Sequence, residues 1–304
     1  MIPAPCVVVT IYADLTGARA LPMVDRLARV AAPGDLAVCV HDPPGRDEEG
    51  LARAIRDRGL RLWYAWGVDP DTRLAVLDAA AQTRRRARLA AERGAEVVEL
   101  NGEAAWRTDT AEVGDAHPRA PLAQVMLAAA REGAPAAAVS WTSYDHVGWH
   151  RLPWRTIAGP GGVDLFAPQY YAANPSDDDV EGRRDADARL YGRARDQLAE
   201  LVRRGVVRPE LAHGGAGWTP YGQVHGLTCA GAAVVLDAAP ITRAWALPSR
   251  CDAAGLDALE GVLRARRLTG HRAAGAVRRA QERLGVAVDG SLGPETLAAL
   301  RAAT

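Results

Sequence analysis

The stretch EVVELNGEAAW, residues 96–106, has the pattern of a buried strand that ends in polar side chains. Side chains alternate between the two faces of a strand, so Glu99, Asn101 and Glu103 point to one side, while Val98 and Leu100 point to the other. Three polar groups at one end of an apolar strand have two explanations. Either they are satisfied polar groups of the core, or they form the mouth of an active site.

Similar short apolar runs recur along the chain and alternate with amphipathic segments rich in Ala, Arg and Leu. We expect strands at 6–13, 36–41, 60–66, 95–101, 136–141, 163–170, 209–213 and 241–247, and helices that include Pro70–Arg93, Asp185–Arg204, Tyr221–Ala238 and Asp252–Arg267. Eight such units predict an α/β fold, a (β/α)8 TIM barrel over residues 1–268. A doubly wound open sheet would show the same local alternation. The count of eight and the lack of a glycine-rich nucleotide fingerprint favour the barrel.

Composition excludes several classes of function. The chain has 304 residues, of which 48% are hydrophobic and 24% are charged, and its formal net charge is zero. This balance is typical of a globular protein and does not indicate binding to nucleic acid or to an anionic membrane. No apolar run approaches the roughly 20 residues that span a bilayer. Because the N-terminus runs straight into the first strand, we expect synthesis in the cytoplasm without a visible signal peptide.

The four cysteines, Cys6, Cys39, Cys229 and Cys251, are scattered along the chain. They form neither a CxxC pair nor the pattern of a small disulfide-rich domain. Cys6 and Cys39 fall within expected strands, so we expect buried free thiols.

The histidines call for a test of metal binding. His146 and His150 are four residues apart, which would place two ligands on one face of a helix. However, Gly148 and Pro153 argue against a stable helix, and no Glu follows the first histidine. The loop GPGG at 159–162 lacks the lysine of a phosphate-binding loop. We therefore expect neither a metal nor a cofactor.

In a (β/α)8 barrel the active site lies at the carboxyl ends of the strands, and the aromatic and polar residues of this chain gather at those predicted ends. The expected substrate-binding residues are Trp63, Trp66, Trp141, Tyr144, Gln169, Tyr170, Tyr171, His213, Trp218 and Trp245. Aromatic rings beside carboxylates suit sugars, whose apolar faces stack on rings while their hydroxyls form hydrogen bonds. The alternative is that these aromatics only cap the barrel core.

Catalytic roles follow from position along the fourth strand. Glu103, at the mouth, is the better general acid, whereas Glu99 lies deeper, where burial would raise its pKa or require a partner. The two carboxylates would be about 13 Å apart along an extended strand, too far for the acid–nucleophile pair of a standard glycosidase. Asn101 would hold a substrate amide or orient Glu103.

A second catalytic group must therefore come from elsewhere. Asp14 and Asp42 are candidates by position, at the ends of the first and second strands. Alternatively, a substrate N-acetyl group replaces the protein nucleophile, as in some glycosidases, with Tyr170 or Tyr171 assisting. The remaining possibility is a purely structural polar network inside the barrel.

The C-terminal segment AVRRAQERLGVAVDGSLGPETLAALR, residues 276–301, predicts two amphipathic helices around a tight turn at Asp289-Gly290. Pro294 stands in the first turn of the second helix, where proline is favoured. The segment resembles the peptidoglycan-binding domain family, with matches at Gln281, Leu284, Gly285, Asp289, Gly290, Gly293, Pro294, Thr296, Ala299 and Leu300. The resemblance implies a partial wall-binding helical segment over residues 269–304.

Considered with this segment, the barrel resembles the lysozyme-type muramidases of glycoside hydrolase family twenty-five and their relatives. That family carries Asp-x-Glu at the end of strand four and an Asp at the end of strand one. Asp14 matches the latter, and Asn101-Gly102-Glu103 matches the former with Asn in place of Asp, while APQYYA at 167–172 is similar to the aromatic sixth strand.

The resemblance implies a peptidoglycan glycan hydrolase of the endolysin or bacteriophage-tail kind, which reaches the cell wall after lysis or on a particle. One alternative is a non-catalytic wall-binding or injection-particle protein. A second is a glycosidase acting on another polysaccharide.

Overall fold

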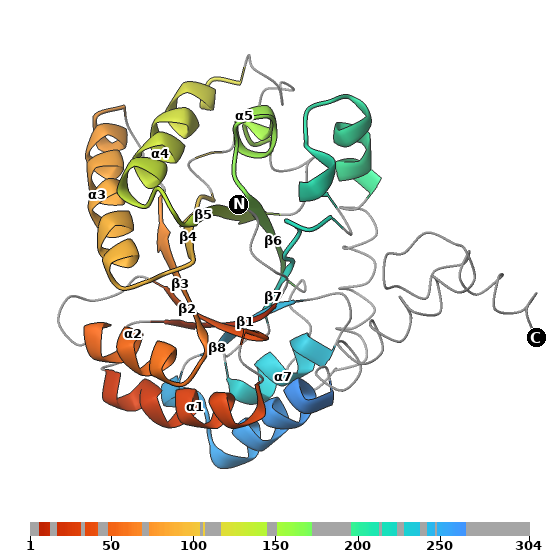
Figure 1. Ribbon diagram of the computed structural model, residues 1–304. Coiled ribbons are helices and arrows are strands. Elements are labelled where there is room, and N and C mark those ends of the chain that lie inside the picture. Colours follow the sequence, from red (N-terminus) through yellow and green to blue (C-terminus); the bar gives the residue numbers. More distant parts are fainter. Residues whose placement is uncertain are drawn as a thin grey trace, which may run out of the picture.

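The computed structural model describes residues 6–12, 17–31, 34–41, 48–68, 73–103, 106, 117–144, 151–171, 196–212, 215–223, 228–237, 242–246 and 248–265. Within these ranges eight parallel strands close into a barrel in the order β1 to β8 (Figure 1). The strands are β1 Val7–Tyr12, β2 Leu36–His41, β3 Arg61–Gly67, β4 Val97–Asn101, β5 Ala138–Tyr144, β6 Leu165–Tyr171, β7 Tyr221–Gln223 and β8 Arg243–Ala246. The predicted (β/α)8 barrel is confirmed, and the open sheet is excluded because β1 pairs with β8.

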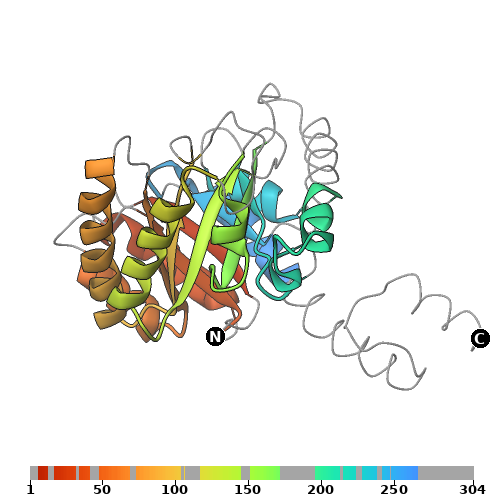
Figure 2. The same cartoon turned by 90° about the horizontal axis from the view of Figure 1, so that it is seen from above.

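Helices surround this barrel on its outside (Figures 1 and 2). They are α1 Gly17–Val30, α2 Glu48–Asp57, α3 Arg73–Glu92, α4 Ala120–Gly133, α5 Trp154–Ala158 and α7 Cys229–Asp237, and residues 196–203 and 253–265 are also helical. Short 3-10 turns lie at Pro209–Leu211 and Pro248–Arg250. In the described part of the chain no helix is long and apolar enough to cross a membrane.

Strand alternation divides the apolar residues into two layers. In β3, Leu62, Tyr64 and Trp66 belong to the large core between strands and helices. Trp63 and Ala65, on the opposite face, belong to the cluster inside the barrel. The strands are therefore buried on both faces, which explains their nearly continuous apolar sequences.

The seventh strand is not where the sequence predicts it. In the expected range 209–213, the described residues 209–212 do not form a strand, because Pro209–Leu211 is a 3-10 turn that buries Leu211. The actual β7, Tyr221–Gln223, lies within the range expected to begin a helix, and α7 begins only at Cys229. Pro209 suits the first turn of a helix, having no N–H to give to a sheet. A three-residue strand with a central glycine carries too little periodicity to be detected.

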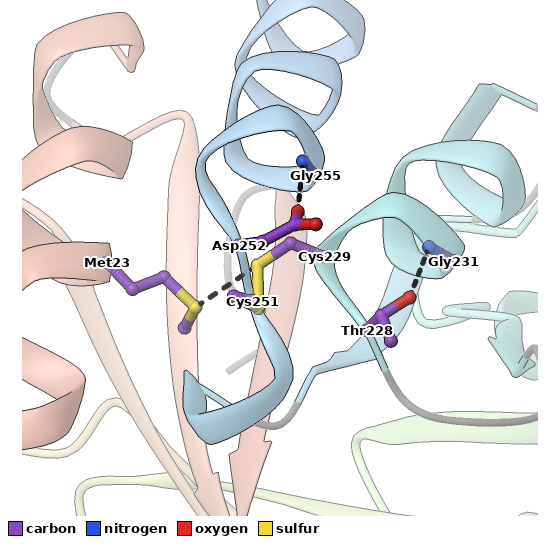
Figure 3. Close-up of a disulfide and its surroundings, with 7 residues drawn as sticks. All are labelled: Met23, Thr228, Cys229, Gly231, Cys251, Asp252 and Gly255. Atoms are coloured by element: carbon purple, nitrogen blue, oxygen red, sulfur yellow. Dashed lines mark hydrogen bonds between the residues drawn. A yellow bond between two sulfur atoms is a disulfide. The ribbon is translucent and has the colours of Figure 1, made fainter.

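The prediction of free cysteines is wrong for one pair. Cys6 and Cys39 are free thiols, but Cys229 and Cys251 form a disulfide across 22 residues of sequence (Figure 3). Cys229 is the first residue of α7, and Cys251 lies two residues before the start of the helix at 253–265. Closure of the barrel brings these two helix N-termini together, with their Cα atoms 4.9 Å apart. No local spacing pattern signals such a pair.

Both helices joined by the disulfide are capped beside it. The Thr228 hydroxyl accepts a hydrogen bond from the Gly231 amide at 3.0 Å, and Asp252 Oδ1 accepts one from the Gly255 amide at 2.7 Å (Figure 3). These side-chain oxygens satisfy amide groups that a helix leaves unpaired at its start. Cys229 Sγ also contacts the sulfur of Met23 in α1 at 3.7 Å. The disulfide thus lies where the first and last units of the barrel meet.

Candidate functional site

Glu99 is fully buried inside the barrel, where it forms an ion pair with Arg243 of β8. The two terminal nitrogens of the Arg243 guanidinium, Nη1 and Nη2, donate to the carboxylate, and Nη2 lies 2.7 Å from Oε1. The Ser140 hydroxyl donates to Oε2 at 2.7 Å. The sequence predicts that a buried Glu99 requires a partner or has a raised pKa, and the structure supplies the partner, Arg243.

Arg243 extends this interaction into a network across the barrel. Its Nη2 donates to the Tyr221 hydroxyl at 3.0 Å, and that hydroxyl also bonds to Thr10 of β1. The guanidinium lies over the Tyr221 ring, 4.0 Å from its centroid, and over Trp63 at 5.1 Å. Cation–π contacts and hydrogen bonds together compensate a cation that is fully out of water.

The network affects the pKa of its members. Burial is the largest single effect on Arg243 and would lower its pKa, but the charge and hydrogen bonds of Glu99, together with Tyr221 and Cys39, outweigh it and raise the pKa overall. Burial raises the pKa of Tyr221 well above its usual value, and it raises the pKa of the neighbouring Cys39 thiol to about 12. The Glu99–Arg243 ion pair therefore lies beside two groups whose neutral forms are favoured, Tyr221 and Cys39.

A second polar cluster lies at the carboxyl end of the barrel, around the other two residues of the opening stretch. Asn101 ends β4 and Glu103 follows it, and both are partly exposed. Gln169 of β6 joins them, because its Nε2 lies 3.1 Å from both Asn101 Oδ1 and Glu103 Oε1. The same nitrogen lies 3.3 Å from the Thr142 hydroxyl of β5. Strands β4, β5 and β6 thus present one connected set of polar groups.

Gly102, between Asn101 and Glu103, is required by close packing. A Cβ at this position would come within 2.3 Å of the Trp141 ring and 2.9 Å of the Trp106 ring. The two indoles meet edge to face, with centroids 5.1 Å apart, and Trp106 donates to the Val68 carbonyl. The chain that carries the polar cluster therefore rests directly on two buried indoles.

Three of the predicted substrate-binding tryptophans lie on the helix side of the barrel wall, which corrects their expected position. Trp66 donates to Thr83 of α3 at 3.3 Å, Trp141 packs on Trp106, and Trp218 packs on Phe166. All three belong to the core between strands and helices. For Trp66 in β3 and Trp141 in β5 this place follows from strand alternation, which turns them away from the interior.

Trp63, Trp245 and Gln169 do face the interior. Trp63 is buried with the apolar cluster there, under Arg243. Trp245 stacks on Tyr221, with centroids 4.9 Å apart, and meets the His41 ring edge-on at 4.9 Å. The structure therefore brings together Glu103, Asn101 and Gln169 at the mouth, with Trp245 also facing inward from β8.

Several predicted site residues belong to parts of the chain that the structure does not describe in full. Asp14, Asp42, His146, His150 and His213 lie outside the described residues, as does the whole segment 269–304, and Tyr144, Tyr170 and Tyr171 are described only by their backbone. No group of three or more His, Cys, Asp or Glu side chains that could hold a metal ion occurs among the residues that are described.

The sequence analysis missed Arg243, Tyr221 and Thr142. Arg243 is two residues before Trp245 in the same strand, so alternation was a usable signal that both face one side. Tyr221 carried no such signal because its strand has only three residues.

No protein-family model matches the chain, and no curated protein matches it. Among solved structures, a GH5_18 protein from Streptomyces cattleya, solved as a variant with Manb1-4GlcNAc, is 13% identical with a TM-score of 0.52, covering 97% of each chain. A GH18 chitinase from Pseudoalteromonas aurantia is 12% identical, covering 84% of this chain and 99% of its own, with a TM-score of 0.47. A beta-mannanase from the blue mussel Mytilus edulis is 9% identical, covering 86% and 93%, with a TM-score of 0.48. At these identities the likeness concerns the barrel fold.

Proposed function

We propose that the protein is a glycoside hydrolase that cleaves the glycan of peptidoglycan, with Glu103 as its general acid. One observation carries the proposal: a partly exposed carboxyl group stands beside an amide pair at the carboxyl end of a (β/α)8 barrel. Barrels of this kind hold their active sites at that end. Glu99 is not needed as the acid, because its charge is already matched by Arg243.

The proposed reaction needs one proton donor and water. The Glu103 carboxyl transfers its proton to the glycosidic oxygen, and the carbon–oxygen bond breaks with its electron pair going to that oxygen. Water then supplies a hydroxyl group to the anomeric carbon, and the remaining proton of that water restores the carboxylic acid. Asp14 is the proposed second carboxylate. The alternative is that an N-acetyl group of the substrate takes its place, which agrees with the presence of Asn instead of Asp at position 101.

The substrate class rests on the C-terminal segment. Its resemblance to the peptidoglycan-binding domain family, over residues 276–301, supports a cell-wall glycan. The GH5_18 protein of similar fold holds Manb1-4GlcNAc in its structure, a disaccharide that contains an N-acetyl amino sugar.

The proposed place of action is the cell wall, reached by lysis or on a particle. The disulfide between Cys229 and Cys251 supports action outside a reducing cytoplasm, because such bonds persist in oxidising surroundings.

A second candidate function is binding to the wall without catalysis. Asn101 favours it, because an amide cannot lend negative charge to the cationic transition state of glycoside cleavage. The paired Glu99 agrees with this alternative, since that carboxylate is committed to Arg243.

The test compares the wild-type chain, Glu103→Gln and the control Glu92→Gln, an exposed residue of α3. Each is assayed for loss of turbidity of purified sacculi, for new reducing ends and for sedimentation with the wall. A general acid contributes about 100- to 10,000-fold to the rate, so Glu103→Gln should lose activity by that order and keep binding. Equal activity of the three proteins would refute the role of Glu103.

Two other outcomes separate the alternatives. Sedimentation of all three proteins with sacculi, without new reducing ends, would favour the binding protein. Inactivity on sacculi with release of reducing ends from chitin or mannan by the wild-type chain would favour a glycosidase for another polysaccharide.

A further inference from the structure

We infer that Gln169 is a positioning residue: it turns the Asn101 amide so that its nitrogen faces the site as a hydrogen-bond donor, and it holds Glu103 by Oε1. The inference rests on the proposed function and deepens it. A site arranged in this way accepts a sugar that presents an oxygen acceptor, a hydroxyl or an acetamide carbonyl, beside the proposed acid.

The contacts of Gln169 determine which way its amide points. Its Nε2 faces Asn101 Oδ1, Glu103 Oε1 and the Thr142 hydroxyl at 3.1–3.3 Å. That hydroxyl donates its own proton to the Ala167 carbonyl at 2.8 Å, so it meets Gln169 as an acceptor. Reversing the amide would place Oε1 against three acceptor oxygens, which hydrogen bonding disfavours.

The buried position of Gln169 makes this orientation persistent. The side chain is 2% exposed, so little water can replace the protein contacts. Its Oε1 is buried and finds no partner among the described residues, which shows that the three contacts of Nε2, and not those of the oxygen, decide the orientation.

The consequence for Asn101 is a fixed polarity. Because Oδ1 accepts from Gln169, Nδ2 points elsewhere, and no described residue accepts a hydrogen bond from it. The side chain is partly exposed, so a ligand can reach this nitrogen. An aspartate here would offer only acceptors when ionised, whereas Asn101 offers two N–H donors. The site therefore selects an acceptor oxygen on the sugar.

The consequence for Glu103 concerns its proton. Oε1 accepts an N–H from Gln169, so a proton on the carboxyl group belongs on Oε2. After that proton is transferred, the same N–H stays bonded to the resulting carboxylate. Gln169 thus holds one oxygen of Glu103 in place and acts without touching the substrate itself.

The experiment exploits the fact that asparagine occurs only at positions 101 and 174. Selective 15N-asparagine labelling gives two side-chain NH2 pairs in an NMR spectrum, and Asn101→Asp identifies one by removing it. Spectra are recorded for the wild-type chain, Gln169→Met, Gln169→Glu and the exposed control Gln124→Leu, first alone and then with chitotetraose. The rate of sacculus hydrolysis is measured for each, as kcat and KM.

We expect the Asn101 pair to lie at the same position in the wild-type chain and in Gln124→Leu, and to move in both variants of Gln169. Loss of orientation at a reacting group costs on the order of 100-fold in rate, so both variants should lower kcat by about 10- to 100-fold with a smaller change in KM. Chitotetraose should shift the Asn101 pair in the wild-type chain. Two variants of Gln169 are made so that the test can be completed even if one of them does not fold. Folding of each is checked by circular dichroism.

An Asn101 pair that stays at its wild-type position in both folded variants would overturn the inference. So would an unchanged kcat in those variants when the wild-type chain cleaves sacculi. If the pair moves as expected but no protein cleaves sacculi, the positioning role stands and the proposed function fails.

Discussion

Removal of the disulfide between Cys229 and Cys251 should destabilise the protein without disturbing its fold. The bond closes a loop of 22 residues. In the chain-entropy account, a cross-link over a loop of this length stabilises the folded state by about 3 kcal/mol at 25 °C. For a domain of this size each kcal/mol corresponds to roughly 2–4 °C, so the melting temperature should fall by about 6–12 °C.

The change is best made at Cys251, because Cys251 is partly exposed whereas Cys229 is fully buried and its removal would also leave a cavity. The assay compares the wild-type chain with Cys251→Ala, each with and without a reducing agent, by circular dichroism melting and urea unfolding. Titration of thiols in denaturant should find two in the untreated wild-type chain and four after reduction, since Cys6 and Cys39 are free.

Reduction should lower the stability of the wild-type chain to that of Cys251→Ala and leave the variant unchanged. Cys6→Ala is the control, because it removes a cysteine without removing a cross-link. If a fully reduced wild-type chain melts at the temperature of the oxidised one, the disulfide carries no stability and the reasoning from loop closure is refuted.

Three further predictions concern the barrel and its support. Glu99→Gln or Arg243→Met alone should lower the free energy of unfolding, measured in urea, by about 3–5 kcal/mol, because each leaves a buried charge without its partner. The double variant should lower it by less than either single variant. Gly102→Ala should destabilise by about 1–3 kcal/mol by the same measure, since its Cβ overlaps the Trp141 ring; a neutral result would contradict the packing described. Burial lowers the pKa of His117, whose ring bonds two backbone groups, so the unfolded chain binds a proton first as the pH falls below about 6.5. The free energy of unfolding, measured in urea at several pH values, should therefore decline as the pH falls below that value. The decline should be shallower in His117→Gln.

The barrel could be predicted from sequence because its signal is local and repeated. Seven of the expected strands, such as 36–41, coincide with or overlap an observed strand, since each carries enough apolar alternation to be seen alone. The exception is instructive. The real β7, Tyr221–Gln223, is held by its neighbours Gln169–Tyr171 of β6 and Arg243–Ala244 of β8, not by its own composition. A strand that forms only because its neighbouring strands pair with it need not show the apolar alternation by which strands are predicted.

The direction of side chains was predictable in part. Trp63 and Trp66 are three residues apart, so a single strand cannot turn both toward the interior, and only Trp63 faces it. Trp141 lies opposite Leu100 of β4, whose outward direction follows from Glu99 and Asn101 beside it. That inference needs the register between two strands, which a single sequence does not contain.

The division between Glu99 and Glu103 arises from the partners that each carboxyl group meets across the barrel. Arg243 is 144 residues from Glu99 in sequence, and Gln169 is 66 residues from Glu103, so neither partner is visible near the opening stretch. Glu99 meets a cation and becomes half of a buried ion pair, whereas Glu103, at the barrel end, has the neutral amide of Gln169 among its partners. A neutral donor orients a carboxyl group without neutralising it, which is the condition that an acid needs if it is to gain and lose a proton. The chain from β4 onward therefore places Glu99 in the barrel interior and Glu103 at the barrel mouth, where the chemistry proposed here takes place.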